Sequence, residues 1–154
     1  MNRSLSEIEA HARAALARHG HGDVADFAGP ACAFLEGVGY AGLKLLAEAL
    51  NDSVTTATLE KDLMGLDLHS VSCVFSGADV ERLQREHGRL FLRNVRHGLY
   101  LLPGSVHGNY AIGCPVDPGF ALGGERTKNP YTEKLGLAAQ NGVAVDDLLW
   151  QSLA

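Results

Sequence analysis

The stretch LDLHSVSCVF, residues 66–75, decides the fold class of this chain. Apolar side chains nearly alternate along it, which is the period of a half-buried β-strand: Leu66, Leu68, Val71, Cys73 and Phe75. The residues before it carry helical spacing instead. The expected fold class is therefore α+β, with N-terminal helices packed on a small antiparallel sheet.

Short elements are expected to follow this strand. Residues 78–86 are amphipathic and predict a short helix. Residues 90–95 and 99–102 predict two further strands joined by the turn Arg96-His97-Gly98, and residues 109–114 are another candidate strand. Because strands with turns this short pair antiparallel, the sheet is predicted to be antiparallel.

Three helices are predicted in the first third of the chain. Ser4 and Glu7 have capping-box spacing, and apolar residues then recur at helical intervals. The second helix is expected to start at Asp23 and to kink or restart at Pro30, where a backbone donor is missing. The third is expected over residues 42–50, apolar on nearly every side.

The last third of the chain differs in composition from the rest. Residues 103–142 are rich in proline and glycine and show no hydrophobic period. A final short helix is predicted over residues 145–153, with Asp146 and Asp147 at its start, where the helix dipole favours acids. Trp150, the single tryptophan, is expected either to close the core or to dock on a partner chain.

Length and composition favour a single folded domain spanning residues 1–154. A chain that is 46% hydrophobic and 20% charged is not intrinsically disordered. The net charge of −5, with scattered basic residues, argues against nucleic acid as a partner.

Cysteine usage predicts a reducing, cytoplasmic location. Cys32, Cys73 and Cys114 are odd in number and form no C-x-x-C pair. The polar first residues do not resemble a signal peptide, and no apolar run approaches the ~20 residues of a membrane span. No membrane partner is therefore expected.

The best sequence candidate for a site is the Gly/Pro-rich segment of residues 116–136. Guanidinium and ammonium groups there could grip a carboxylate or phosphate while hydroxyl groups fix its orientation. The predicted ligand-binding residues are Arg126, Thr127, Lys128, Thr132 and Glu133. The alternative is a solvated loop that covers a sheet edge. No nucleotide-binding glycine motif occurs, so no cofactor is predicted.

Histidines give weaker candidates. His19 and His21 form an H-x-H pair whose imidazoles could share a metal, but no further ligand stands at a diagnostic spacing, so an exposed pair is favoured and no metal is predicted. His69 and Cys73 would share one face of a strand, as a nucleophile–base pair or, more simply, with the cysteine in the core. His97 and His107 bracket the strand expected over residues 99–102.

Two segments carry a resemblance to a known family. The opening SLSEIEA of residues 4–10 with the helices after it, and the late run Arg126-Thr127, Pro130, Thr132-Glu133 and Gly136, together resemble a bacterial family known as domain of unknown function 3726. That family has no assigned activity, so the resemblance implies none. It implies Arg126, Thr127, Thr132 and Glu133 as a site.

Three function classes stay open at this point. The favoured one is a binding or accessory module for a small anionic ligand, combined with dimerisation. The second is a metal-independent enzyme that uses Glu133 or His107 as a base and Arg126 to stabilise negative charge. The third is an oligomeric interaction protein that uses Trp150 and the helix over residues 42–50.

Overall fold

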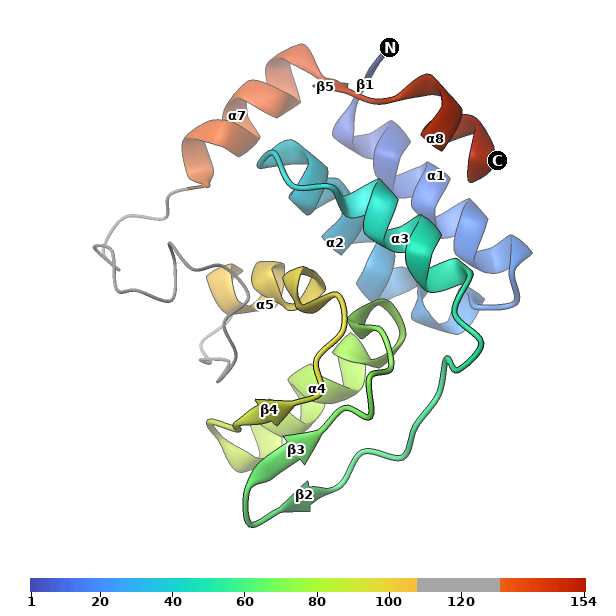
Figure 1. The fold of residues 1–154 in the computed structure, drawn as a ribbon. Helices are drawn as coiled ribbons and strands as arrows, with labels where there is room; N and C mark the ends of the chain where they lie inside the picture. Colours follow the sequence, from blue (N-terminus) through green and yellow to red (C-terminus); the bar gives the residue numbers. More distant parts are fainter. Residues whose placement is uncertain (108–130) are drawn as a thin grey trace. The chain divides into compact units, whose positions relative to one another are not determined.

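The computed structural model describes residues 1–107 and 131–154. The chain divides into two compact units, the first made of Met1–Asp52 with Lys128–Ala154 and the second of Ser53–Thr127. Helices dominate and two small sheets complete the structure, so the predicted α+β class is confirmed (Figure 1). Among the described residues, no helix is long and apolar enough to cross a bilayer.

The first unit opens with helix α1 (Leu5–Arg18), whose start is fixed locally. The Glu7 backbone N–H donates to Ser4 Oγ at 3.1 Å, and the Ser4 backbone N–H donates to Glu7 Oε2 at 2.7 Å. This is the predicted capping box, in which each residue satisfies a backbone donor that the helix itself leaves unpaired.

Two more helices follow the 3-10 turn η1 (Gly22–Val24). Helix α2 (Ala25–Gly37) passes through Pro30 without interruption, so the restart expected there is wrong. Helix α3 (Gly42–Leu50) has the predicted bounds. The fully buried core of α1, α2 and α3 keeps the spacing seen in the sequence: Ile8, Ala12, Ala15, Leu16, Ala28, Cys32, Leu35, Leu43, Leu46 and Ala49.

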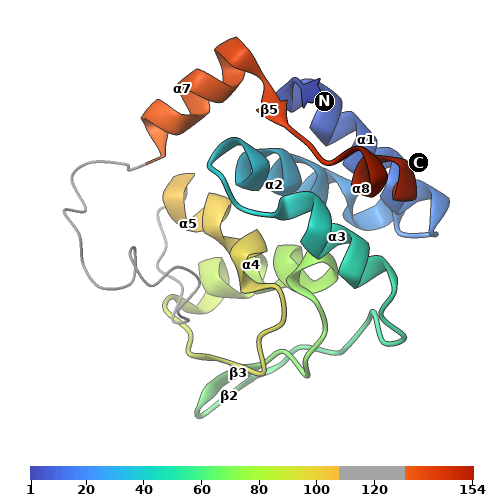
Figure 2. The same ribbon diagram turned by 45° about the horizontal axis from the view of Figure 1, so that its top comes forward.

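The C-terminal residues complete this unit. Helix α7 (Thr132–Asn141) packs on α2, and helix α8 (Asp147–Ser152) packs on α3 (Figure 2). Between them, strand β5 (Val143–Ala144) pairs antiparallel with strand β1 (Asn2–Arg3), which joins the two ends of the chain. The lack of a hydrophobic period over residues 103–142 therefore did not exclude helices, because residues 103–107 and 132–141 are helical.

Trp150 is engaged within its own chain. Its ring stacks on His11 with 3.7 Å between centroids and 5° between planes, and the Arg3 guanidinium carbon lies 4.7 Å from the Trp150 ring centroid. His11 Nε2 is also 2.8 Å from the Trp150 carbonyl oxygen. The tryptophan thus fastens α8 to α1, and Asp146 caps α8 by accepting from the Leu149 N–H at 2.8 Å.

A half-buried carboxylate joins α2 to α3. Glu36 Oε1 accepts a hydrogen bond from the Leu43 backbone N–H at 2.8 Å, in the first turn of α3, which has no capping side chain of its own. Burial raises the pKa of Glu36, and the Leu43 hydrogen bond opposes this only in part. The ionised form is therefore disfavoured in the folded chain.

We expect Glu36→Gln to remove a pH-dependent loss of stability. With the pKa raised on folding, the Glu36 contribution is complete below the unfolded pKa and is lost as pH rises through the folded value. The glutamine variant should match the parent near pH 4 and exceed its free energy of unfolding by up to about 1 kcal/mol at pH 7. Urea unfolding followed by Trp150 fluorescence measures the difference.

Glu36→Ala is the matched control, because it also removes the acceptor for the Leu43 N–H. It should be less stable than the glutamine variant at every pH, by about 1 kcal/mol. A stability gap between parent and glutamine variant that does not change with pH would contradict this account of Glu36.

The second unit contains a small mixed sheet and helices. Strand β3 (Gly65–Asp67) pairs antiparallel with β2 (Lys61–Asp62) and parallel with β4 (Leu92–Arg93). Helix α4 (Cys73–His87) makes the crossover between the parallel strands and lies along one face of them (Figure 1). The prediction of a purely antiparallel sheet is therefore wrong.

Two of the predicted strands are corrected. Residues 73–75 begin α4 rather than extend a strand, because the Ser72 hydroxyl accepts from the Val74 N–H at 3.2 Å and caps the helix. Residues 99–102 form the 3-10 helix η2 (Gly98–Leu101) and the start of α5 (Leu102–His107). The candidate strand over residues 109–114 lies outside the described residues.

Candidate functional site

Two loops meet where the parallel strands β3 and β4 end. The backbone ladder continues past the strands: Leu68 N–H donates to the Arg93 carbonyl at 3.0 Å, and Ser70 N–H donates to the Asn94 carbonyl at 3.0 Å. These main-chain bonds hold the two loops side by side. In sheets with parallel strands, the carboxyl ends of the strands are where ligands bind.

The backbone of these loops is strained. His69, Ser70, Asn94 and His97 all have φ between 52° and 59°, the left-handed region that costs a residue with a Cβ about 1–2 kcal/mol. They are all the non-glycine residues with positive φ in the part of the chain that the structure describes. Such strain persists only where the surrounding structure holds it, and it concentrates at functional sites.

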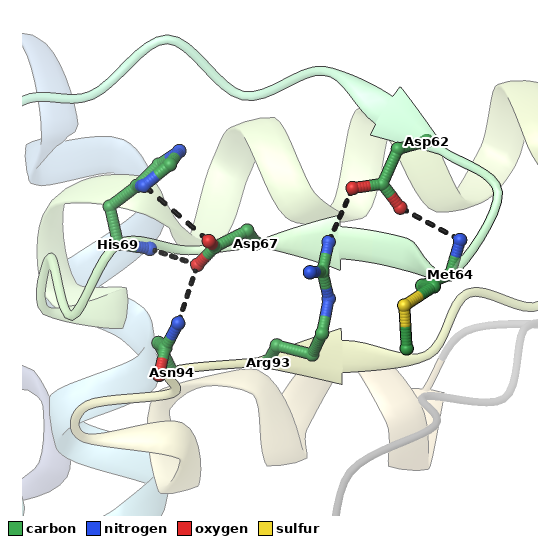
Figure 3. A network of polar contacts seen from close by, with 6 residues as sticks. All are labelled: Asp62, Met64, Asp67, His69, Arg93 and Asn94. Atoms are coloured by element: carbon green, nitrogen blue, oxygen red, sulfur yellow. Dashed lines mark hydrogen bonds and ion pairs between the residues drawn. The ribbon is translucent and has the colours of Figure 1, made fainter.

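Asp67 is the centre of a polar network on these loops (Figure 3). Its Oδ1 accepts from Asn94 Nδ2 at 2.9 Å and from the His69 backbone N–H at 2.9 Å. Its Oδ2 lies 3.6 Å from His69 Nδ1, an electrostatic contact longer than a hydrogen bond. The Asn94 hydrogen bond, followed by the His69 N–H, lowers the pKa of Asp67, so its carboxylate stays ionised.

A second carboxylate lies beside this network. Asp62 Oδ1 accepts from the Met64 N–H at 2.8 Å, and Asp62 Oδ2 pairs with Arg93 Nη2 at 2.5 Å. The Met64 hydrogen bond, with help from Arg93, lowers the pKa of Asp62. Arg93 stands opposite Asp67 in the β3–β4 register, and its guanidinium points toward Asp62 (Figure 3).

A buried serine ties the second loop to helix α4. Ser72 Oγ lies 2.7 Å from His97 Nδ1 and, as the helix cap, also accepts from the Val74 N–H. Ser72 is fully buried, so its hydroxyl is a structural group and not a nucleophile open to solvent. The Cys73 N–H donates to the Arg96 carbonyl and the Phe75 N–H to the Ser72 carbonyl, so this helix start does not present an anion-binding set of donors.

The site residues predicted from sequence divide into two groups. Arg126, Thr127 and Lys128 lie outside the described residues. Thr132 and Glu133 are exposed in the first turn of α7, in the first unit, and their side chains make no hydrogen bond or ion pair with the described residues. An acidic residue there is explained by the helix dipole alone.

The histidine and cysteine candidates are also rearranged. His69 and Cys73 do not share a strand: His69 is exposed on a loop, and Cys73 is buried at the start of α4. Cys32 is buried in α2, and Cys114 lies outside the described residues. His19 Nδ1 is 2.9 Å from the Ala15 carbonyl oxygen, which occupies one ring nitrogen of the H-x-H pair.

Sequence reasoning missed Asp67, Arg93 and Asn94. They are brought together by parallel pairing across the whole of α4, and nothing local in the sequence encodes that pairing. The available signals were Asn94 and the histidines His69 and His97, since asparagine and histidine adopt left-handed backbone more often than most residues.

Within residues 1–107 and 131–154, no group of three or more histidine, cysteine, aspartate or glutamate residues is placed to hold a metal ion. Comparison with protein-family models, curated proteins and solved structures finds no match for this chain.

Proposed function

We propose that this chain is a small-molecule binding module whose ligand contacts Asp67, His69, Arg93 and Asn94. The observation that carries the proposal is the concentration of left-handed residues in the two loops at the carboxyl ends of β3 and β4. If these loops only connected strands to helices, glycine at the same positions would form the turns with less backbone strain.

The side chains support the same location. Asp67 and Asn94 are fixed to each other, while His69 keeps 55% of its side chain exposed. Arg93 Nε is buried and has no hydrogen-bond partner among the described residues. The site therefore offers polar groups that are already oriented, which lowers the entropic cost of binding a ligand.

The strain predicts that one substitution stabilises the fold. Ser70 makes no side-chain hydrogen bond with the described residues and is exposed, with φ of 59°. We expect Ser70→Gly to raise the free energy of unfolding of the second unit by about 1 kcal/mol, because glycine adopts this backbone without a Cβ penalty. Hydrogen exchange of the amides in residues 65–97 measures this unit separately from the tryptophan-containing one.

Binding itself is tested with the full-length chain labelled with ¹⁵N. A library of small polar molecules should contain members that shift the backbone amides of His69, Ser70 and Asn94. Asn94→Ala should abolish those shifts, because it removes the Asp67 partner. His87→Ala, at the other end of α4, is the matched control and should leave them unchanged.

The proposal is wrong if no library member shifts these amides, or if ligands shift residues 131–136 instead. The second result would support the alternative that the notable polar run from Arg126 to Glu133 is the ligand site, with an anion as its ligand.

A further inference from the structure

His69 is an exposed side chain of the Asp67 network, with 55% of its side-chain surface open to solvent. Its backbone N–H is bound to Asp67 Oδ1, and its Nδ1 faces Asp67 Oδ2 at 3.6 Å. Figure 3 shows the ring standing over the carboxylate, with its Nδ1 edge turned toward Asp67. A neutral imidazole carries one N–H and one lone pair, and the neighbouring charge decides which nitrogen holds which.

The carboxylate cannot easily turn away from the ring. Asn94 Nδ2 and the His69 N–H both hold Asp67 Oδ1, so Oδ2 stays directed at the imidazole. An ionised carboxylate at this position favours the proton on Nδ1 and leaves the lone pair on Nε2. Among the described residues, His69 Nε2 has no hydrogen-bond partner.

The local charge also restricts the ligand. Within the hydrogen-bonded network itself, Asp62 and Asp67 carry two negative charges, and the Arg93 guanidinium is already paired with Asp62. An anion approaching His69 Nε2 would meet a lone pair with an ionised carboxylate behind it. A hydroxyl or a protonated amine would instead find a hydrogen-bond acceptor with favourable charge.

We propose that His69 Nε2 accepts a hydrogen bond from the ligand, and that the ligand is a neutral hydroxyl compound or an amine rather than an anion. This inference rests on the proposed function, because it names the ligand class of the same site. Asp67 and Asn94 act as positioning residues that set the tautomer of His69.

The tautomer is tested first, without any ligand. Long-range ¹H–¹⁵N correlation spectra of the histidine rings at pH 8.5, above the ordinary imidazole pKa, distinguish the two neutral forms. The chain contains both internal references. His19 must carry its proton on Nδ1 to donate to the Ala15 carbonyl, and His11 must carry it on Nε2 to donate to the Trp150 carbonyl.

We expect the His69 spectrum to match that of His19. Asp67→Asn should move it toward an equal mixture or toward the His11 pattern, while His87 is unchanged. Asn94→Ala keeps the Asp67 carboxylate but removes the Asn94 hydrogen bond that orients it. This variant should change the His69 ring signals in the same direction as Asp67→Asn, but less. A parent His69 that matches His11 overturns the proposal, whatever the chain binds.

The ligand class is tested with ethanolamine, propane-1,3-diol, glycolate and inorganic phosphate, each at up to 50 mM. We expect ethanolamine or propane-1,3-diol to shift the His69 ring signals at least five-fold more than phosphate does, and His69→Gln to remove the effect on the Asn94 amide. Larger shifts with phosphate or glycolate, or none with either donor, overturn the ligand class. The broader library experiment then still decides whether the site binds any ligand.

Discussion

Gly65→Ala should unfold much of the sheet in the second unit, at a cost of about 3–5 kcal/mol. Gly65 is buried at the start of β3 with φ of +111°, a backbone conformation that a side chain strongly disfavours. A Cβ at this position would lie 2.2 Å from the Phe91 carbonyl oxygen and 2.9 Å from the Phe91 nitrogen.

This collision cannot be relieved by a side-chain rotation, because both Phe91 atoms belong to the main chain. The same Phe91 carbonyl accepts the Leu66 N–H at 2.9 Å, so moving it away separates β3 from β4. Separation would also break the Leu68–Arg93 bond and displace the loops that hold Asp67 and Asn94. We therefore expect loss of hydrogen-exchange protection at Leu66 and Leu68, together with loss of ligand-induced shifts.

Gly88→Ala is the matched control for this variant. Gly88 ends α4 in the same unit with φ of +78°, but a Cβ there would have no neighbour within 4 Å in the part of the chain that the structure describes. Its φ is combined with ψ of −150°, a region that only glycine adopts readily, so its substitution should cost the backbone penalty alone, about 1–3 kcal/mol. Equal costs for the two alanines would show that the approach of Phe91 to Gly65 is not what makes Gly65 necessary.

Elements governed by local signals could be predicted from the sequence. Ser4 and Glu7 correctly predict the start of α1, and apolar spacing correctly predicts the bounds of α3. Both signals are local, because capping and periodicity act within a few residues. Helix α7 is hard to predict although Tyr131, Leu135 and Ala138 have helical spacing, because the many glycines and prolines before it are typical of irregular structure. The start of α4 after Ser72 is hard to predict for a related reason. The alternation of Leu66, Leu68 and Val71 continues without a break into the apolar first turn of α4, so the predicted strand extends too far.

The candidate site could not be predicted because its geometry is non-local. Asp67 and Asn94 are 27 positions apart, and their contact depends on parallel pairing of β3 with β4 around the α4 crossover. No periodicity in the sequence distinguishes that pairing from the antiparallel one that short turns suggested. The left-handed backbone of His69 and His97 could not be located from residue type alone, although histidine adopts it more often than most residues do.

Gly42→Ala should destabilise the first unit by about 2–4 kcal/mol. Gly42 begins α3 and is buried where that helix crosses α2: a Cβ would lie 2.7 Å from the Cys32 carbonyl oxygen and 3.1 Å from Leu35 Cβ. Because its φ is not positive, alanine would otherwise be the better helix residue, by up to about 1 kcal/mol. The steric cost must therefore exceed that gain for the variant to be less stable.

Replacing Gly136 by alanine should change the free energy of unfolding of the same unit in the opposite direction. Gly136 lies exposed within α7, and a Cβ there would meet no atom of the described residues within 4 Å. Gly136→Ala should thus raise the free energy of unfolding by about 0.5–1 kcal/mol through helix propensity alone. Urea unfolding followed by Trp150 fluorescence compares the two variants directly.

The displacement expected in Gly42→Ala also reaches Glu36. If α3 moves away from α2, the Leu43 N–H leaves Glu36 Oε1, and the carboxyl becomes more exposed. Its pKa should then fall back toward the ordinary value, so adding Glu36→Gln should give a smaller gain at pH 7 than it gives in the parent chain. Full additivity of the two substitutions would mean that α3 stays in place and that the Cys32 carbonyl yields instead.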